Sequence, residues 1–183
     1  MADHDFDKDI TDIANSDAKA LSNIYAAYKT AVYSLAVSIL HDHQAAEDVS
    51  QDVFLKIWIN ARSFRIGSNP KSWILSITRN EAIDAWRKKM PLVSMDDEFV
   101  NGIADDRDDY ESKLNTMVLT GKLKELPEDI AQIIVLHVVG GLNNMEIGRI
   151  MKMSIATVYR KYNKGISILQ ERLAEEEGVE QNV

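Results

Sequence analysis

Apolar residues recur three and four positions apart along most of this 183-residue chain, and no segment alternates apolar and polar residues with a period of two. The first spacing gathers apolar side chains on one face of an α-helix, whereas strict alternation is typical of a half-buried strand. Only three prolines are present to interrupt helices. The sequence therefore predicts an all-α fold.

Three long helices are predicted in the N-terminal half. The first covers residues 17–40, as one helix or as two with a bend, and ends at a polar turn of two histidines and an aspartate. The second covers about 44–60 and the third about 71–89, after a loop rich in turn-forming residues. Because each helix carries an apolar face, we expect a small helical bundle over residues 17–90.

The C-terminal half predicts a helix-turn-helix. A helix begins at Pro127 and stops at Gly140, and a short helix then opens with the N-cap pair Asn143 and Glu146. Ser154 caps the last helix, which is apolar on one side. Its opposite side carries the polar residues Thr157, Arg160, Lys161 and Lys164. A basic second helix is typical of DNA-binding helix-turn-helix motifs, although an ordinary helical hairpin with solvated lysines is the alternative.

The charge of the chain is distributed unevenly. Its 29 acidic and 21 basic residues give a net charge of −8, which by itself argues against a nucleic-acid partner. Yet residues 67–91 and 122–173 each carry a net charge of +3, and the segment 92–121 between them carries −6. The two basic zones are candidates for binding phosphate, and the acidic segment is typical of a solvated linker between two domains.

Composition narrows the chemistry and the location. The chain has no cysteine, which excludes disulfides, iron–sulfur clusters, thiolate zinc sites and a cysteine nucleophile. No run of apolar residues is long enough to span a membrane, and the N-terminus is acidic where a signal peptide is basic. We therefore expect a cytoplasmic protein, in which any catalysis would be left to hydroxyls, carboxylates and the four histidines.

The predicted helix over about 44–60 has two different faces. Val49, Val53 and Ile57 form an apolar stripe suited to a core. The other side mixes acidic, amide and large apolar groups, namely Asp48, Gln51, Asp52, Leu55 and Trp58. Such a mixture suits a protein-binding surface, and the alternative is a helix that is packed on both sides within its own domain.

The predicted helix over about 71–89 also has a mixed outer face. It collects an aromatic ring, apolar and polar groups and cations, namely Trp73, Ile77, Asn80, Asp84, Arg87 and Lys88. Stacking surface beside hydrogen-bonding groups and positive charge suits single-stranded or partly opened nucleic acid. Alternatively, Trp73 is a partly buried core residue and the basic end caps the helix dipole.

Three stretches, in order, resemble the extracytoplasmic-function (ECF) sigma factors of bacterial RNA polymerase. They are AAEDVSQDVFLKIW at 45–58, PKSWILSITRNEAID at 70–84, and LPE at 126–128 followed by GLNNMEI at 141–147 and SIATV at 154–158. The resemblance implies a two-domain initiation factor that joins core polymerase, recognises two promoter elements and opens the downstream one.

The resemblance also implies domain boundaries. A domain like sigma region 2 would cover residues 17–90, and a helix-turn-helix domain like sigma region 4 would cover 114–173. The acidic linker 91–113 would join them and resembles the segment that the family threads toward the RNA-exit path. The acidic extensions 1–16 and 174–183 match nothing in the family.

Residue by residue, the resemblance implies three surfaces. The surface for the clamp coiled coil of the largest polymerase subunit matches Asp48, Gln51, Asp52, Leu55 and Trp58. The surface that receives a flipped base of the minus-ten element and lies beside it matches Phe64, Lys71, Trp73, Asn80, Asp84, Arg87 and Lys88. The helix that enters the major groove of the minus-thirty-five element matches Ser154, Thr157, Arg160, Lys161 and Lys164. The implied partners are core polymerase, including its region facing the upstream element, promoter DNA and an anti-sigma factor.

Three positions depart from the family pattern. Lys152 stands where glycine is usual in the turn of the helix-turn-helix, so this turn needs a positive φ at a non-glycine residue or another geometry. Ala156 and Tyr159 stand where glycine and a basic residue are common. The sequence therefore leaves open which upstream promoter sequence is recognised.

Other classes of function compete with this interpretation. A metal-dependent hydrolase could use His41, Asp42, His43 and Glu47, since His43 and Glu47 are one helical turn apart. A self-sufficient helix-turn-helix regulator of duplex DNA would have to dimerise and leaves the mixed faces unexplained. A regulatory protein that keeps the fold only to bind a sigma antagonist is a third possibility.

Overall fold

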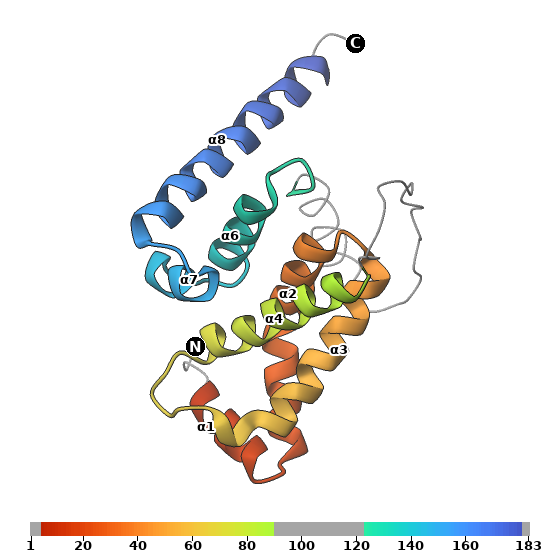
Figure 1. The fold of residues 1–183 in the computed structure, drawn as a ribbon, viewed down its shortest axis with the longest axis vertical. Helices are drawn as coiled ribbons and strands as arrows, with labels where there is room; N and C mark the ends of the chain where they lie inside the picture. Colours follow the sequence, from red (N-terminus) through yellow and green to blue (C-terminus); the bar gives the residue numbers. More distant parts are fainter. Residues whose placement is uncertain (1–4, 90–122, 181–183) are drawn as a thin grey trace.

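The computed structural model describes residues 5–89 and 123–180, and every regular element in those ranges is a helix (Figure 1). The all-α prediction is confirmed. The elements are α1 (Phe6–Ala14), α2 (Ala18–Leu40), α3 (His43–Asn60), the short 3-10 helix η1 (Ala61–Ser63), α4 (Pro70–Lys89), α6 (Glu128–Val138), α7 (Asn144–Met151) and α8 (Ile155–Glu180). The predicted linker, residues 91–113, lies outside the described residues. None of the described helices combines the length and the apolar content needed to cross a bilayer.

Acidic side chains begin two helices of the N-terminal bundle. The carboxylate of Asp17 accepts from the N–H groups of Lys19 and Ala20 at the start of α2. The predicted 17–40 segment is a single helix, which ends with His41 in the left-handed conformation at φ 52°. Asp42 then caps α3 by accepting from the N–H of Ala45 at 3.1 Å. A helix end and a helix start therefore share one tight corner.

α1 is an element that the sequence analysis did not predict. It lies inside the segment 1–16, which we set apart as an acidic extension, and its Ile10 and Ile13 are buried in the core. The ring of Phe6 packs edge-on against Tyr28 of α2, with the ring centroids 5.1 Å apart. Three apolar residues at helical spacing thus anchor α1 to the bundle, although aspartates dominate its composition.

α2 lies at the centre of the molecule. It packs against α1, α3, α4 and α6, as Figure 1 shows for the helices around it. Its C-terminal half is buried nearly continuously, from Ala31 to Leu40 with only Tyr33 partly exposed. A helix that is apolar on most sides must be covered on most sides, which explains why four other helices surround it.

The turn between α7 and α8 uses a lysine in the left-handed region. Lys152 has φ 56° and ψ 42°, so the positive φ expected from the sequence is present without a glycine. Gly148 permits the close approach at this turn, because a methyl group there would lie 2.8 Å from the carbonyl oxygen of Met153. The predicted capping box of Asn143 and Glu146 is confirmed.

The helices before and after the undescribed segment are in contact. α6 packs on α2 and α7 packs on α4. A methyl group on Gly140 would lie 2.6 Å from the backbone oxygen of Leu136 and 2.7 Å from Cδ1 of Leu75, so glycine avoids a backbone clash where the chain after α6 lies against α4. The side-chain amide of Asn69, before α4, donates to the carboxylate of Glu146 in α7. The helix-turn-helix therefore rests on the start of α4.

Candidate nucleic-acid and protein-binding surfaces

The mixed face of α3 is exposed along its length. Asp48, Gln51 and Asp52 are exposed, Leu55 is 57% exposed, and Trp58 is half-buried. On the opposite side of α3, three apolar residues are buried in the bundle, namely Val49, Val53 and Ile57. α3 therefore contributes one face to the core and leaves the other uncovered within the described part of the chain. Ile59, 65% exposed and one turn after Leu55, extends this apolar surface.

The loop before α4 brings Phe64 and Trp73 together. Phe64 is only 8% exposed, and its ring packs edge-on against Trp73 at a centroid distance of 5.3 Å. This corrects the expectation that Phe64 lies free to contact a flipped base. The loop folds back beneath α4, because burying an aromatic ring against another ring is favourable. Trp73 is half-buried and keeps part of its surface open.

The remaining predicted residues of α4 lie at the surface. Lys71, Asn80, Asp84, Arg87 and Lys88 are exposed, and Ile77 is partly buried. Asp84 lies 3.7 Å from Arg87, so it offsets one of the positive charges at this end of the helix. Sequence reasoning missed Trp86, which is 40% exposed and directly precedes the basic run.

The basic face of α8 divides into two groups. Arg160 and Lys164 are exposed, whereas Lys161 is partly buried and forms an ion pair with Asp129 of α6. Lys161 therefore ties α8 to α6. At the start of α8, Ser154 Oγ accepts from the N–H of Thr157 at 3.2 Å, as the predicted cap requires. The hydroxyls of the same two residues lie 2.9 Å apart.

Two apolar side chains at the start of α8 point to solvent. Ile155 is 54% exposed and Tyr159 is 58% exposed. They are one helical turn apart, so they lie on one face of the helix. The sequence analysis noted Tyr159 only as a departure from a basic residue. It counted Ile155 with the apolar side of the helix, and this is wrong, because Ile155 lies at the first turn and is exposed whereas Val158 is buried. This face offers apolar contact beside Arg160.

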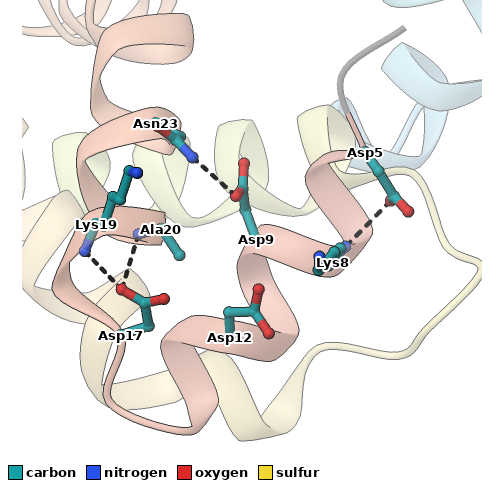
Figure 2. Close-up of a pocket in the computed structure, with 8 residues that line it drawn as sticks. All are labelled: Asp5, Lys8, Asp9, Asp12, Asp17, Lys19, Ala20 and Asn23. Carbon is teal, nitrogen blue, oxygen red and sulfur yellow. Dashed lines mark hydrogen bonds between the residues drawn. The ribbon is translucent and has the colours of Figure 1, made fainter. Parts of the chain in front are cut away.

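A polar pocket of about 380 Å³ lies between α1 and the start of α2 (Figure 2). It is lined by Asp5, Lys8, Asp9, Asp12, Asp17, Lys19, Ala20 and Asn23. The amide of Asn23 donates to the buried carboxylate of Asp9 at 3.1 Å, and Asp17 caps α2. Among these acidic groups, Asp9 joins α1 to α2, whereas Asp5 and Asp17 cap the starts of α1 and α2.

One histidine at the α2–α3 corner, His43, has a structural partner. The hydroxyl of Tyr33 and Nδ1 of His43 lie at hydrogen-bonding distance, 2.8 Å. Burial, together with the negative charge of Glu47, raises the pKa of Tyr33 to about 12. Within residues 5–89 and 123–180, no three His, Asp or Glu side chains stand close enough to share a metal ion. The geometry that a metal-dependent hydrolase needs is therefore not assembled in this part of the chain.

Comparison with known proteins decides the family. Residues 24–91 match the family model described as sigma-70 region 2, and residues 86–174 match the model described as ECF sigma factor. The chain is 31% identical over 141 residues to the ECF RNA polymerase sigma factor SigM of Bacillus subtilis, covering 74% of this chain and 84% of SigM. The chain belongs to the ECF sigma factors.

Further relatives agree with the family over nearly the whole chain. This ECF sigma factor is 28% identical over 178 residues to SigW of Bacillus subtilis, covering 91% of this chain and 95% of SigW. Among solved structures, it is similar to the sigma factor RpoE of Bartonella quintana in complex with the anti-sigma factor NepR, with a TM-score of 0.68, 27% identity and coverage of 86% and 98%. CnrH, solved with the cytosolic domain of CnrY, shares the fold at a TM-score of 0.66, 18% identity and coverage of 92% and 97%. As an ECF sigma factor, the chain is an alternative factor for transcription initiation.

Proposed function

We propose that this ECF sigma factor binds core RNA polymerase through the exposed face of α3, recognises the minus-thirty-five element with α8, and opens the minus-ten element beside α4. The observation that carries the proposal is the division of α3 into a buried apolar stripe and an exposed mixed stripe. Exposure of Leu55 to water does not stabilise the isolated chain, so we expect a protein partner to bury this side chain.

The chemistry of the α3 face supports a protein partner rather than DNA. Asp48 and Asp52 would repel phosphate, but they can pair with basic side chains at the rim of an interface. Leu55 and Trp58 supply apolar surface between them, and such a composition is typical of the centre of a binding site. We assign this face to the clamp coiled coil of the largest polymerase subunit.

The start of α4 supports a role in promoter opening. The open part of the Trp73 ring can stack on an unpaired base, while Lys71 and Asn80 offer charge and hydrogen bonds. Phe64 supports Trp73 from below through its edge-on contact. Arg87 and Lys88 at the far end of the helix can contact phosphates, with Asp84 limiting their net charge. We therefore assign base capture to Trp73 and a supporting role to Phe64.

The exposed face of α8 supports duplex recognition. Arg160 and Lys164 are free to reach phosphates or base edges in a major groove. Ser154 and Thr157 are fixed by their mutual hydrogen bond at the helix start. Lys161 holds α8 against α6 through Asp129 and thereby orients the helix in the groove. Duplex contact therefore centres on Arg160 and Lys164.

The proposed partners place the protein in the cytoplasm, where core polymerase and promoter DNA are found. The factor acts by binding, so no catalytic group and no cofactor is assigned to it. An anti-sigma factor is a proposed third partner, because two structurally similar sigma factors were solved in complex with an anti-sigma factor or a comparable partner domain. Such an antagonist would compete for the α3 face.

Reconstituted transcription tests this function. Core polymerase with the full chain is supplied with a library of random upstream duplexes, and the promoters that give transcripts are recovered. One recovered promoter is then used fully paired and with a pre-melted minus-ten element. Trp73→Ala should lower transcription from the paired promoter much more than from the pre-melted one, because losing one stack removes about 1–3 kcal/mol from the opened state. Lys164→Ala should lower both alike.

The outcomes separate the candidate functions. If core polymerase with this chain yields no promoter-dependent transcript, the sigma function is wrong. If the isolated protein shifts duplex DNA specifically at nanomolar concentration and core polymerase adds nothing, the self-sufficient regulator is correct. If Trp73→Ala affects both templates equally while the variant is folded, the opening role of Trp73 is wrong.

A further inference from the structure

The loop between η1 and α4 has few internal supports. Its turn is closed by the N–H of Ser68, which donates to the carbonyl oxygen of Arg65 at 3.0 Å. Gly67 occupies the third position of this turn at φ +81°, the geometry of a type II turn, which favours glycine. Ile66 and Gly67 are exposed at the tip. A loop of this kind needs contacts from outside to hold one conformation.

At Asn69 the loop is held by Glu146 of α7, and around Gly67 the outside contacts come from α1. The backbone N–H of Gly67 donates to the carboxylate of Asp7 at 3.2 Å. Nε of Arg62 donates to the carbonyl oxygen of Ala14 at 3.3 Å. Asp7 and Ala14 are seven residues apart, which is about 10 Å along a helix. The two hydrogen bonds therefore fix both the position and the direction of the segment from 62 to 67.

α1 is packed against the bundle, so the residues of α1 that bind the loop can hold the loop in one position. Ile10 and Ile13 are buried, and Phe6 packs against Tyr28. On its other side, Asp9 accepts from Asn23 of α2, as Figure 2 shows. α1 thus lies between α2 and the loop and contacts both. Removing one carboxylate from its loop-facing side would leave this attachment in place.

We infer that Asp7 is a positioning residue for promoter opening: through Gly67 it sets the place of the loop that lies beside Trp73. The inference rests on the proposed function, because it concerns the same base-capturing surface. The carboxylate accepts a hydrogen bond from a backbone N–H that would otherwise have only water as its partner. Without the hydrogen bond from the Gly67 N–H to Asp7, the turn at Gly67 can move, and the loop no longer keeps one position beside Trp73.

The geometry predicts a direct consequence for the loop in the full chain. In Asp7→Ala, the amide hydrogen of Gly67 should exchange with solvent faster than in the wild type by about fivefold, the change that corresponds to one net hydrogen bond. Asp7→Asn keeps an acceptor oxygen and should stay close to the wild type. Asp12→Ala is the matched control, because Asp12 belongs to the same helix but lines the pocket of Figure 2.

The functional experiment measures base capture rather than overall activity. Holoenzyme made from core polymerase and the full chain binds a set of partly melted promoters, in which each base of the minus-ten element is removed in turn. In the wild type, loss of the captured base weakens binding. In Asp7→Ala, the factor by which removal of the captured base weakens promoter binding should be about fivefold smaller, and removal of other bases should have the same effect as in the wild type. A change in stability alone would leave the penalty unchanged, and Asp12→Ala should behave as the wild type.

Each outcome bears on a different statement. If the wild type shows the penalty and Asp7→Ala keeps it in full, Asp7 does not position the loop for capture. If Gly67 exchanges at the same rate in Asp7→Ala and in the wild type, the hydrogen bond does not hold the loop, and the inference is overturned whatever transcription shows. If the wild type shows no penalty at any position, base capture by this surface is wrong, and the role of Asp7 in it is wrong too.

Discussion

Nε of Arg79 in α4 donates a hydrogen bond to Oε1 of Gln132 in α6 at 3.0 Å, and Nε2 of Gln132 donates to Glu128 at the same distance. Gln132 is 2% exposed. Burial lowers the pKa of Arg79 below its usual value, against the attraction of Glu128, although this guanidinium remains charged at neutral pH. A buried amide thus connects a cation of one half of the chain to an anion of the other.

Removing that amide should destabilise the fold. Gln132→Ala leaves Arg79 half-buried without its acceptor, and we expect the free energy of unfolding to fall by about 1–3 kcal/mol in a urea titration. Glu128→Ala is the control, because Glu128 is exposed and its loss leaves the Arg79–Gln132 hydrogen bond intact. Equal losses in the two variants would contradict this assignment.

Replacing Lys152, the left-handed residue in the turn of the helix-turn-helix, with glycine should stabilise the fold. Lys152→Gly removes the Cβ that makes φ 56° unfavourable, so the free energy of unfolding should rise by up to about 1 kcal/mol. Lys152→Ala keeps a Cβ and should bring no gain. Thermal unfolding of the full chain measures both, and a stabilised alanine variant would show that the lysine charge, and not the backbone, is responsible.

The two faces of α3 should respond differently to truncation. Leu55→Ala should change the free energy of unfolding little, because Leu55 is exposed, yet weaken binding to core polymerase by about 1–2 kcal/mol. Ile57→Ala, on the buried side, should lower the free energy of unfolding by about 2–5 kcal/mol. Denaturant titration and a core-binding assay check the pair. Normal core binding by a folded Leu55→Ala would remove α3 from the polymerase interface.

The lysines of α8 should differ in their effect on DNA binding. Lys164→Ala should reduce the slope of log affinity against log salt concentration by about 0.9, as expected for one phosphate contact. Lys161→Ala should change the slope less, because that lysine is paired with Asp129. Holoenzyme binding to a duplex promoter at several salt concentrations measures both slopes. The reverse order would mean that Lys161 leaves Asp129 when DNA binds.

The cap of α3 should make stability depend on pH. The hydrogen bond from Lys89, and after it the N–H of Ala45, lowers the pKa of Asp42 below 3.8. A group whose pKa is lower in the folded state stabilises the fold above its unfolded value and loses this contribution as the pH falls through the folded value. The difference in unfolding free energy between wild type and Asp42→Asn should therefore be constant near neutral pH, begin to shrink near pH 3.8 and vanish only below the lowered pKa of folded Asp42. A difference that persists in strong acid would rule out the carboxylate as its source.

The sequence predicted the features that depend on local chemistry. Apolar spacing indicated α2, α3, α4 and α6 to α8, and the cap at Asn143 was visible from its partner Glu146 three residues later. Of the two geometries that the missing glycine left open at Lys152, the structure has the positive φ. In each case the signal lies within a few residues of the feature.

Contacts between distant segments escaped the sequence analysis. Phe64 is buried because a loop folds back beneath α4, and Lys161 is paired because α6 lies beside α8. α1 was missed for another reason, since its many aspartates hid the spacing of Phe6, Ile10 and Ile13. The partners lie 9 residues apart for Phe64 and Trp73, 22 for Phe6 and Tyr28, and 32 for Asp129 and Lys161, and each pair joins two different elements, which no pattern within one helix encodes.

The contact between Asn69 and Glu146 has a consequence for distance along the promoter. Two elements about 25 base pairs apart are separated by ~85 Å of duplex. In the proposed function α4 and α8 contact the two elements, so a chain that keeps this contact, with the start of α4 held against α7, would reach one element at a time. Binding both elements at once therefore requires the helices before and after the undescribed segment to separate. The distance between the two promoter elements thus selects the separated form of the chain.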